Sequence, residues 1–224
     1  MAEREELATS QKIGNLIEKN KVKFIVCLIV VACALAGYIT TYAIYNSLKN
    51  KNLSRIDEIT FTLTDKSGSL EESELEARSN TAIEQLAPFT KKNGIAGARA
   101  NMICAEIAFQ QKKYQESADF WKAAAKKAKK SYIAPIAYFN IGVCYEQLNN
   151  IDAAAENYKI AADNKSFVIK NHAKFSYGRV LEAQGKYAEA VSVFTEINDS
   201  NPDDSWAKLA KSRIIALKVQ GKVE

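Results

Sequence analysis

Few side chains in this sequence are suited to acid–base, nucleophilic or metal chemistry. There is a single histidine, His172, and the four cysteines all lie in apolar helical patterns without CxxC spacing. This spacing argues against a disulfide framework and against a zinc site. The sequence also has no glycine-rich phosphate loop and no GxSxG or HExxH motif. We therefore expect no enzyme activity, no bound metal and no cofactor. The cysteines are Cys27, Cys33, Cys104 and Cys144.

The densest group of carboxylates is better explained by helix formation than by chemistry. The run "SLEE" from Ser69 to Glu72 has the pattern of a capping box, in which a serine and a glutamate cap the first turn of a helix. Glutamates in such a turn are favoured by the helix dipole. We predict a leading helix from Leu70 to about Ala87, closed by Pro88 and the following "KKNG". The glutamates are Glu71, Glu72, Glu74 and Glu76.

The composition indicates a helical protein of ordinary size. The chain has 224 residues, of which 47% are hydrophobic and 25% are charged, with only 3 prolines and 9 glycines. These fractions are typical of a globular chain rather than a disordered one. The fold class that we predict is all-α, with one transmembrane helix at the N-terminus.

The transmembrane prediction rests on the run "FIVCLIVVACALAGYITTYAIY", residues 24–45, which contains no charge and no proline. As a helix it would extend about 33 Å, enough to cross the bilayer core. Tyrosines gather at its C-terminal end, as in interfacial aromatic belts. Two alternatives involve cleavage: a signal peptide cut after "ALA" at 34–36, or a lipoprotein signal at Cys33. A third is a buried helix of a soluble protein.

Charges on either side of this run set the expected orientation. Five basic residues precede it and three follow it closely. The positive-inside rule then places residues 1–23 in the cytoplasm as a short tail, and the rest of the chain outside it. In a bacterium this would be an inner-membrane protein with a periplasmic domain. Residues 46–68 are polar and are expected to form a tether, with one helical or extended turn between Ile56 and Leu63. The basic residues are Arg4, Lys12, Lys19, Lys21 and Lys23 before the run, and Lys49, Lys51 and Arg55 after it.

The remainder of the chain contains an internal repeat. Three segments align: "KKYQESADFWKAA" from 112, "NNIDAAAENYKIA" from 149 and "GKYAEAVSVFTEI" from 185. Each has a turn pair, a large residue, a small residue three positions later and an aromatic four positions after that. The large residues Tyr114, Ile151 and Tyr187 follow one another at intervals of 37 and 36. A period in the thirties with two helices per unit indicates a helical solenoid.

A glycine in the preceding helix recurs in register with these segments. It is Gly142 in the second unit and Gly178 in the third, with Ala105 at the equivalent place in the first. Glycine in a helix interior costs about 1 kcal/mol, whereas burying an aromatic side chain gains about 2–3 kcal/mol. We expect each small residue to make room for an aromatic of the neighbouring helix. These aromatics are Trp121, Tyr158 and Phe194.

This arrangement resembles the tetratricopeptide repeat (TPR) family, whose pattern of Leu-Gly, Tyr, Gly-x-Tyr, Ala, aromatic, Ala and Pro matches most fully in the second and third units. The resemblance covers about Ala98 to Pro202. It implies units at 98–133, 134–170 and 171–203 and a capping helix at 204–218, within a domain of 98–224 that follows a leading helix region at 69–97. The matching residues include Tyr138, Ile141, Gly142, Tyr145, Ala154, Tyr158 and Ala161 in the second unit, and Gly178, Gly185, Tyr187, Ala190, Phe194 and Pro202 in the third.

The resemblance implies a concave groove, lined by the first helix of each pair, that binds a protein or peptide segment. Three phenylalanines at groove positions are unexpected on a solvent-facing helix surface. They would either receive a partner's apolar segment or be covered by the tether or capping helix. The pattern lacks the cations of the family's carboxylate clamp, so capture of an acidic C-terminal tail is not expected. The groove positions are Arg99, Met102, Glu106, Phe109, Ile136, Phe139, Val143, Glu146, His172, Phe175, Arg179 and Glu182.

A lysine-rich stretch, "KAAAKKAKK" at 122–130, is a second candidate surface. Such runs are usually solvated helix faces. The alternative is contact with anionic headgroups or an acidic partner, to which each lysine near an anionic surface adds up to about 1 kcal/mol. Nucleic acid is not expected, because the stretch has little aromatic interleaving. The lysines are Lys122, Lys126, Lys127, Lys129 and Lys130.

The order of parts resembles that of bacterial inner-membrane TPR proteins that accompany the Sec translocon. That resemblance implies a scaffold or chaperone-like adaptor in envelope protein translocation, folding or assembly. The expected partners are other proteins or peptide segments, together with the bilayer around residues 24–45, and no small-molecule substrate. The alternative is a fixed structural subunit of an envelope machine for outer-membrane assembly or cell division.

Overall fold

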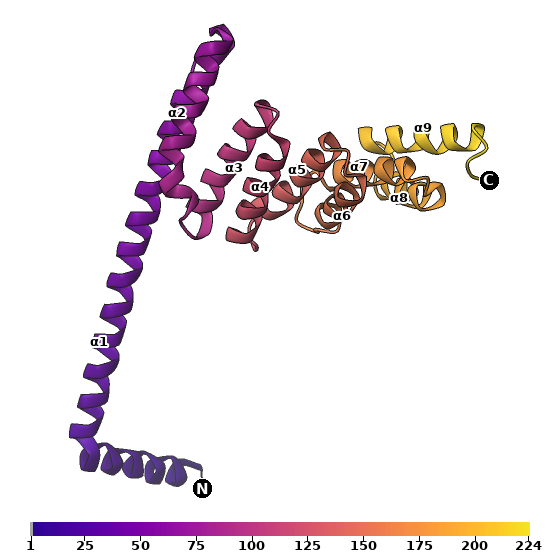
Figure 1. The fold of residues 1–224 in the computed structure, drawn as a ribbon. Coiled ribbons are helices and arrows are strands. Elements are labelled where there is room, and N and C mark those ends of the chain that lie inside the picture. The colour runs from indigo at the N-terminus through magenta and orange to yellow at the C-terminus, as the bar shows by residue number, and fades with distance from the viewer. Residues whose placement is uncertain (1) are drawn as a thin grey trace. The chain divides into compact units, whose positions relative to one another are not determined.

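The computed structural model describes residues 2–224, and position 1 of the expected N-terminal tail lies outside them. The described residues fall into two compact units, one reaching to Lys51 and the other from Asn52 to Glu224. Apart from one 3-10 turn, every regular element in the described chain is an α-helix (Figure 1). The predicted all-α fold class is therefore confirmed.

The first unit is formed by the helix α1, Ala2–Thr64, whose last turns belong to the second unit. Its backbone departs from helical geometry at Asn20, with φ −116° and ψ 18°. The apolar run at 24–45 lies after this break and is helical throughout. Within residues 17–69 an 18-residue window has a mean hydropathy of 2.5, and none of it is buried. By length and composition this helix is able to cross a bilayer.

The second unit begins with the final turns of α1, and here the expectation of a polar tether at 46–68 was wrong. The chain remains helical to Thr64. Leu53, Ile56, Ile59 and Leu63 recur every three or four residues and therefore form one helix face. Ile56 and Ile59 are buried, and the face packs against the next two helices, α2 (Glu72–Thr90) and α3 (Gly94–Gln110). Because residues 46–68 are mostly polar, their composition alone does not indicate this narrow apolar helix face.

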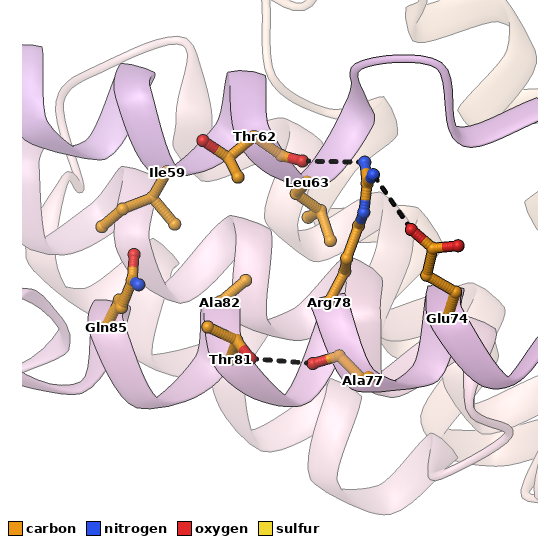
Figure 2. A pocket seen from close by; sticks show the side chains of 9 residues that line it. All are labelled: Ile59, Thr62, Leu63, Glu74, Ala77, Arg78, Thr81, Ala82 and Gln85. Carbon is orange, nitrogen blue, oxygen red and sulfur yellow. Dashed lines mark hydrogen bonds and ion pairs between the residues drawn. The ribbon is translucent and has the colours of Figure 1, made fainter. Parts of the chain in front are cut away.

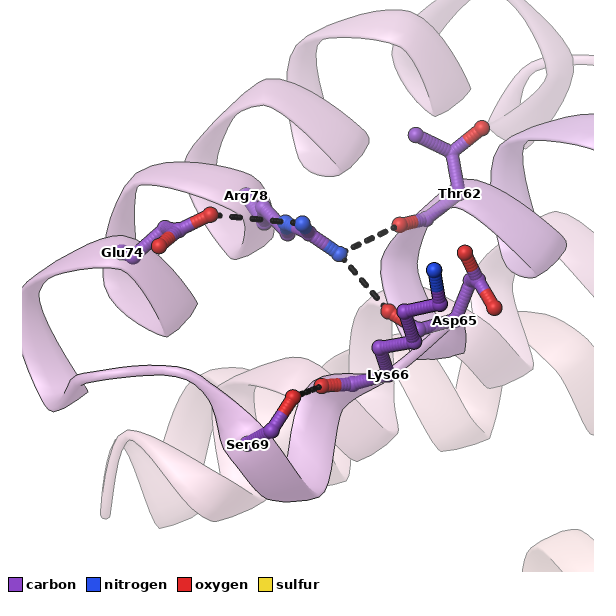
Figure 3. Close-up of polar contacts among 6 residues, drawn as sticks. All are labelled: Thr62, Asp65, Lys66, Ser69, Glu74 and Arg78. Atoms are coloured by element: carbon purple, nitrogen blue, oxygen red, sulfur yellow. Dashed lines mark hydrogen bonds and ion pairs between the residues drawn. The ribbon is translucent and has the colours of Figure 1, made fainter.

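Arg78 of α2 fixes the turn between α1 and α2 (Figure 3). Its Nη1 donates to the carbonyl oxygens of Thr62 and Asp65 at 3.3 and 2.9 Å, and its Nη2 pairs with Glu74 at 3.3 Å. The guanidinium thus satisfies carbonyl groups at the C-terminal end of α1, which lack partners within the helix.

The predicted capping box at Ser69 was wrong. Ser69 lies in the 3-10 turn η1 (Ser67–Ser69), and its hydroxyl donates to the carbonyl oxygen of Lys66 at 2.8 Å instead of accepting from a helix amide. Lys66 has a left-handed backbone, with φ +53°, which turns the chain before the helix begins. As a result α2 begins only at Glu72, and no side chain caps it.

Pro88 does not close α2, contrary to expectation. The helix continues through it to Thr90. Proline removes one backbone hydrogen bond from a helix, so the last residues need other support. Phe89 packs on the apolar cluster that α2 forms with α1 and α3. The side-chain amide of Asn101 donates to the carbonyl oxygen of Thr90 at 3.0 Å. Tertiary contacts therefore outweigh the local helix-breaking preference.

Three helical hairpins and a final helix follow from residue 94 onward. Each hairpin packs on the next through shared core clusters, so that the core runs along the array. The first hairpin begins at Gly94, four residues before the expected start at Ala98. The helices are α3 with α4 (Tyr114–Lys127), α5 (Ile133–Gln147) with α6 (Ile151–Ala162), α7 (Lys170–Ala183) with α8 (Tyr187–Ser200), and α9 (Ser205–Val219).

The registered glycines seat aromatic rings, as predicted. A Cβ added to Gly142 would lie 2.7 Å from Cδ1 of Tyr158, and one added to Gly178 would lie 2.5 Å from Cε1 of Phe194. Both distances are far below van der Waals contact. Tyr158 and Phe194 are almost completely buried. In the second and third hairpins, the missing side chain is therefore a condition for burying the ring.

We expect Gly178→Ala to lower the free energy of unfolding by about 1–3 kcal/mol, because the added methyl group overpacks a buried ring that has no free space. The urea unfolding midpoint, followed by circular dichroism, measures this loss. Gly68→Ala is the control, because no atom lies within 4 Å of the added Cβ there, and it should change the midpoint little. An unchanged midpoint for Gly178→Ala would contradict the role assigned to the glycine.

Candidate functional site

The twelve expected groove residues lie on α3, α5 and α7, the first helix of each hairpin. The structure places them in three different settings. Those at the two ends of the array contact α1 or α9. Ile136, Phe139 and Glu146 pack or pair between the second and third hairpins. Glu106, Phe109 and Val143 border an open hollow.

At the N-terminal end, α1 engages the groove. The guanidinium of Arg99 pairs with the carboxylate of Asp57, with Nη2 and Oδ1 2.5 Å apart. Met102 packs against the core of the first and second hairpins and is only partly exposed. These two side chains therefore support the fold and offer little free surface.

At the C-terminal end, α9 covers the groove. Trp206 stacks on His172, with ring centroids 4.0 Å apart and an angle of 11°, and also contacts Phe175 at 5.4 Å. Arg213 holds the carboxylate of Glu182 by two hydrogen bonds, the one from Nε being 3.0 Å long. The helix expected as a cap thus fills this end of the groove.

Two groove positions on α5 join the core between hairpins. Phe139 contacts the rings of Tyr158, Phe167 and His172 at centroid distances of 5.4, 6.4 and 4.7 Å. Ile136 packs with the same cluster. Much of the aromatic surface that suggested a binding role is thus used for packing within the chain.

A polar link joins the second and third hairpins beneath the groove. The carboxylate of Glu146 accepts hydrogen bonds from the hydroxyl of Tyr158 at 2.5 Å and from Nη2 of Arg179 at 2.6 Å. Burial, reinforced by Glu146, raises the pKa of Tyr158 well above its usual value, so the phenol remains a neutral donor. Because Glu146 is paired, this part of the groove carries no unbalanced charge.

The middle of the groove contains a partly open hollow of about 180 Å³ between α3 and α5. Its walls are mainly apolar, with the ring of Trp121 buried among them. The phenyl ring of Phe109 is held edge-on by Tyr114 at 5.2 Å. Three expected groove residues meet here: Glu106, Phe109 and Val143. The complete lining is Glu106, Phe109, Gln110, Trp121, Asn140 and Val143.

Glu106 is the distinctive polar group of this hollow. It also lines a second hollow of about 180 Å³ toward α1 and α2, where apolar side chains alternate with threonine and serine hydroxyl groups. The residue is exposed overall, but partial desolvation of its carboxyl group by the hollow walls raises the pKa of that group. Among the described residues no cation or hydrogen-bond donor pairs with it, unlike Glu146 and Glu182. The hollow therefore combines an apolar interior with an unbalanced carboxylate.

A third hollow, of about 200 Å³, lies between the end of α1 and α2 (Figure 2). Its interior is formed by apolar side chains, including Ile59, Leu63 and Ala82. Its two charged residues, Arg78 and Glu74, pair with each other, and Arg78 also donates to the carbonyl oxygen of Thr62. Since no charge is left unpaired there, this hollow has less to offer a specific ligand than the one at Glu106.

The lysine-rich stretch divides into two parts. Lys122 pairs with Asp119 at 3.1 Å and lies 5.2 Å over the ring of Tyr145. Lys127 donates from Nζ to the carbonyl oxygen of Lys92 at 2.8 Å. Lys126, Lys129 and Lys130 border an open hollow at the end of α4 and are exposed.

The buried thiols are unsuited to nucleophilic chemistry. Burial, with a smaller effect of Glu116, raises the pKa of Cys104 to about 12, and burial also raises the pKa of Cys144. A thiol is reactive as the thiolate, so both side chains stay inert near neutral pH. Within residues 2–224, outside the few N-terminal side chains that are not placed, no group of three or more metal-ligating side chains converges.

Sequence reasoning missed three residues of the central hollow, Gln110, Trp121 and Asn140. Gln110 follows Phe109 at the end of α3, and nothing in the repeat pattern marks it. The repeat pattern predicts only that Trp121 packs within its own repeat. In the first unit the equivalent small residue is alanine rather than glycine, and Trp121 lines a hollow as well as filling the core.

These features define an array of helical hairpins with a groove that is open in its middle. Residues 77–133, 121–169 and 147–205 match the model of the tetratricopeptide repeat, together more than half of the chain. The chain therefore belongs to the tetratricopeptide repeat family, whose members are protein-binding scaffolds. The match begins within α2, ahead of the expected first unit.

Similar proteins include a relative from Treponema pallidum (strain Nichols) named TPR repeat-containing protein, which is 32% identical over 139 residues. The alignment covers 62% of this chain, and the chain spans 58% of the length of that relative. The crystal structure of YrrB, described as a TPR protein with an unusual peptide-binding site, has a TM-score of 0.49 and 17% identity, covering 80% of this chain and 89% of that one. A crystal structure of MamA protein has a TM-score of 0.46 and 22% identity, covering 69% and 85%.

We expect Glu106→Gln to raise the thermal unfolding midpoint at pH 7. Burial raises the pKa of this carboxyl group, so the folded state favours its protonated form, and the ionised group opposes folding once the pH exceeds both its unfolded value of 4.5 and its folded value. The gain should shrink as the pH falls toward 4.5. Differential scanning calorimetry at both pH values measures the two midpoints.

The matched control is Glu182→Gln, which removes the charge of a paired carboxylate. It should lower stability by about 1 kcal/mol, because Arg213 loses its charged partner. If Glu106→Gln lowered the midpoint at pH 7 as Glu182→Gln does, the carboxylate of Glu106 would have a stabilising partner, contrary to its assignment.

Proposed function

We propose that this protein is a membrane-anchored scaffold that binds a segment of another protein in the central hollow of its groove. The observation that carries the proposal is the meeting of Glu106, Phe109 and Val143 in one hollow that the ends of the chain leave open. Because α1 and α9 engage the two ends of the groove, the middle is the part left for a partner.

The hollow favours a particular kind of segment. A space of about 180 Å³ walled by Phe109, Trp121 and Val143 suits one large apolar side chain. Glu106 at its edge favours an adjacent lysine, arginine or backbone N–H group, because a charge-assisted hydrogen bond would relieve its unpaired carboxylate. Aromatic anchors in partly desolvated pockets commonly supply most of the binding energy of an interface.

The membrane part of the proposal is supported by residues 24–45 of α1, which are apolar all round and exposed along their length. A soluble helix with that much exposed apolar surface would aggregate. The excess of basic residues before this segment favours a cytoplasmic N-terminus and an extracytoplasmic repeat domain, at the inner membrane of a bacterium.

Together these features favour an adaptor that handles other membrane or envelope proteins during translocation, folding or assembly. The alternative is a fixed subunit of one envelope machine. An adaptor exchanges several partners through the same hollow, whereas a fixed subunit holds one partner at constant stoichiometry. Crosslinking from within the hollow separates the two.

We expect a photoreactive amino acid at position 143 to form adducts in cells with several envelope proteins, because Val143 lines the hollow and is partly exposed. Adducts are identified by mass spectrometry after affinity purification of the full chain. One adduct at constant stoichiometry would instead indicate the fixed subunit.

The control position is 156, since Glu156 is exposed on α6 outside the hollow lining. Glu106→Lys should abolish the adducts formed from position 143, whereas Glu156→Lys should not. Equal adducts from positions 143 and 156, or adducts that survive Glu106→Lys unchanged, would contradict binding in this hollow.

A further inference from the structure

Two stretches of the chain that are distant in sequence bring basic residues together at one end of the first hairpin. Residues 85–105 contain no acidic residue, and neither do residues 120–145. They meet where Nζ of Lys127 donates to the carbonyl oxygen of Lys92 at 2.8 Å. We call the resulting group the lysine patch. It consists of Lys91, Lys92, Lys126, Lys127, Lys129 and Lys130.

The patch borders an open hollow of about 490 Å³ at the end of α4. Apart from Lys127, its lysines are exposed, and no carboxylate among the described residues pairs with them. The lysines elsewhere that do form ion pairs, such as Lys159 and Lys174, have acidic neighbours within 2.6 Å. The patch is therefore an uncompensated concentration of positive charge.

Its backbone is held in a fixed position. At Gly97 a Cβ would lie 1.8 Å from the carbonyl oxygen of Lys92, so only glycine allows the turn before α3 to pack this closely. The stem of Lys127 lies beside the same glycine, with Cδ 3.1 Å from the position of that Cβ. This contact joins the turn after α2 to the end of α4 and keeps both groups of lysines together.

The lysine patch lies at the same end of the second unit as Asn52, the residue with which that unit begins. Helices α1 and α2 run antiparallel, because Arg78 contacts Thr62 and Asp65 while Leu53 and Phe89 share one cluster. The C-terminal end of α2, with Lys91 and Lys92, is therefore level with the start of the unit at Asn52. The apolar run of α1 ends at Tyr45, seven positions before that start.

Tyr132 lies two residues after Lys130 of the patch and is 62% exposed. Tyrosine is enriched at membrane–water interfaces, where its ring lies among the headgroups and its hydroxyl group faces water. An exposed aromatic ring beside unpaired lysines favours a lipid surface as the ligand, because the ring can lie among the headgroups. A small free anion would bind the lysines without contacting the ring.

We propose that the lysine patch binds the anionic headgroup surface of the bilayer that holds α1. The proposal rests on the membrane anchoring proposed above, and it adds a second contact that would fix the orientation of the repeat domain on the membrane. The favourable interaction comes from several lysines near an anionic surface, and it weakens as salt shortens the range of the charges.

The test uses the full chain reconstituted into nanodiscs of phosphatidylcholine, with or without phosphatidylglycerol. The rate of acetylation of each lysine is measured by mass spectrometry. In the anionic discs at low salt, we expect the exposed lysines of the patch to react about fivefold more slowly than in the zwitterionic discs, and high salt should abolish the difference. Lys208, Lys211 and Lys218 of α9 should react equally in both.

A triple variant tests whether the protection from acetylation depends on the lysine patch or only on the total charge of the protein. With Lys126→Gln, Lys129→Gln and Lys130→Gln combined, Lys91 and Lys92 should lose their protection. The matched variant with Lys208→Gln, Lys211→Gln and Lys218→Gln should keep it. Equal protection in the two kinds of disc, or equal protection of the lysines of α9, would overturn the proposal.

Two further outcomes also decide between explanations. Protection by inorganic phosphate alone, in zwitterionic discs, would indicate a small-anion site and overturn the assignment to a lipid surface. Failure of the chain to enter either disc would contradict membrane anchoring and this proposal together. Incorporation without protection in anionic discs would contradict this proposal alone.

Discussion

The fold of the second and third hairpins depends on the contact between a helix backbone and an aromatic ring. At Gly142 and Gly178 the rings of Tyr158 and Phe194 approach so closely that no side chain fits between them. This contact brings the two helices of a hairpin together and buries the ring almost completely. The loss of helix propensity at glycine, about 1 kcal/mol, is outweighed by the burial of the ring. Packing of one hairpin on the next then follows from the apolar faces that remain.

In the second hairpin, the same contact also positions a partner for a groove carboxylate. Because Tyr158 is seated under Gly142, its hydroxyl reaches the carboxylate of Glu146, which also binds Arg179 of the next hairpin. The first hairpin has Ala105 and Trp121 at the corresponding places, and an indole ring has no hydroxyl to donate. Glu106 on the same hairpin has no partner among the described residues. In register with the glycines, Phe109 takes the position of Glu146, and Glu106 takes that of Val143 and Arg179. The unbalanced carboxylate is therefore a feature of the first hairpin that has no counterpart in the other two.

The sequence predicted the repeats and the seating of rings well, because both depend on the spacing of small and large residues along a helix. It failed where tertiary contacts overrode local preference. The helical end of α1 depends on Ile56 and Ile59 packing against later helices, and Pro88 is tolerated because Phe89 is anchored. The repeat pattern predicts which positions lie on the first helix of each pair, but it does not predict the contacts of Trp206 and Arg213 with those positions. They depend on how α9 packs on α7, which no repeat spacing encodes.

The two proposed binding surfaces are electrically independent, which allows both to be occupied at once. The hollow is lined near the C-terminal end of α3, at Glu106 and Phe109, whereas the lysine patch adjoins its N-terminal end, at Gly94 and Ile95. Eleven residues of helix separate Ile95 from Glu106, a rise of about 17 Å. This exceeds the Debye length of about 8 Å at physiological salt, so charge at one surface is largely screened from the other. A cationic segment attracted by Glu106 would therefore not be repelled by the lysine patch, and a domain held on an anionic surface would still be able to receive it.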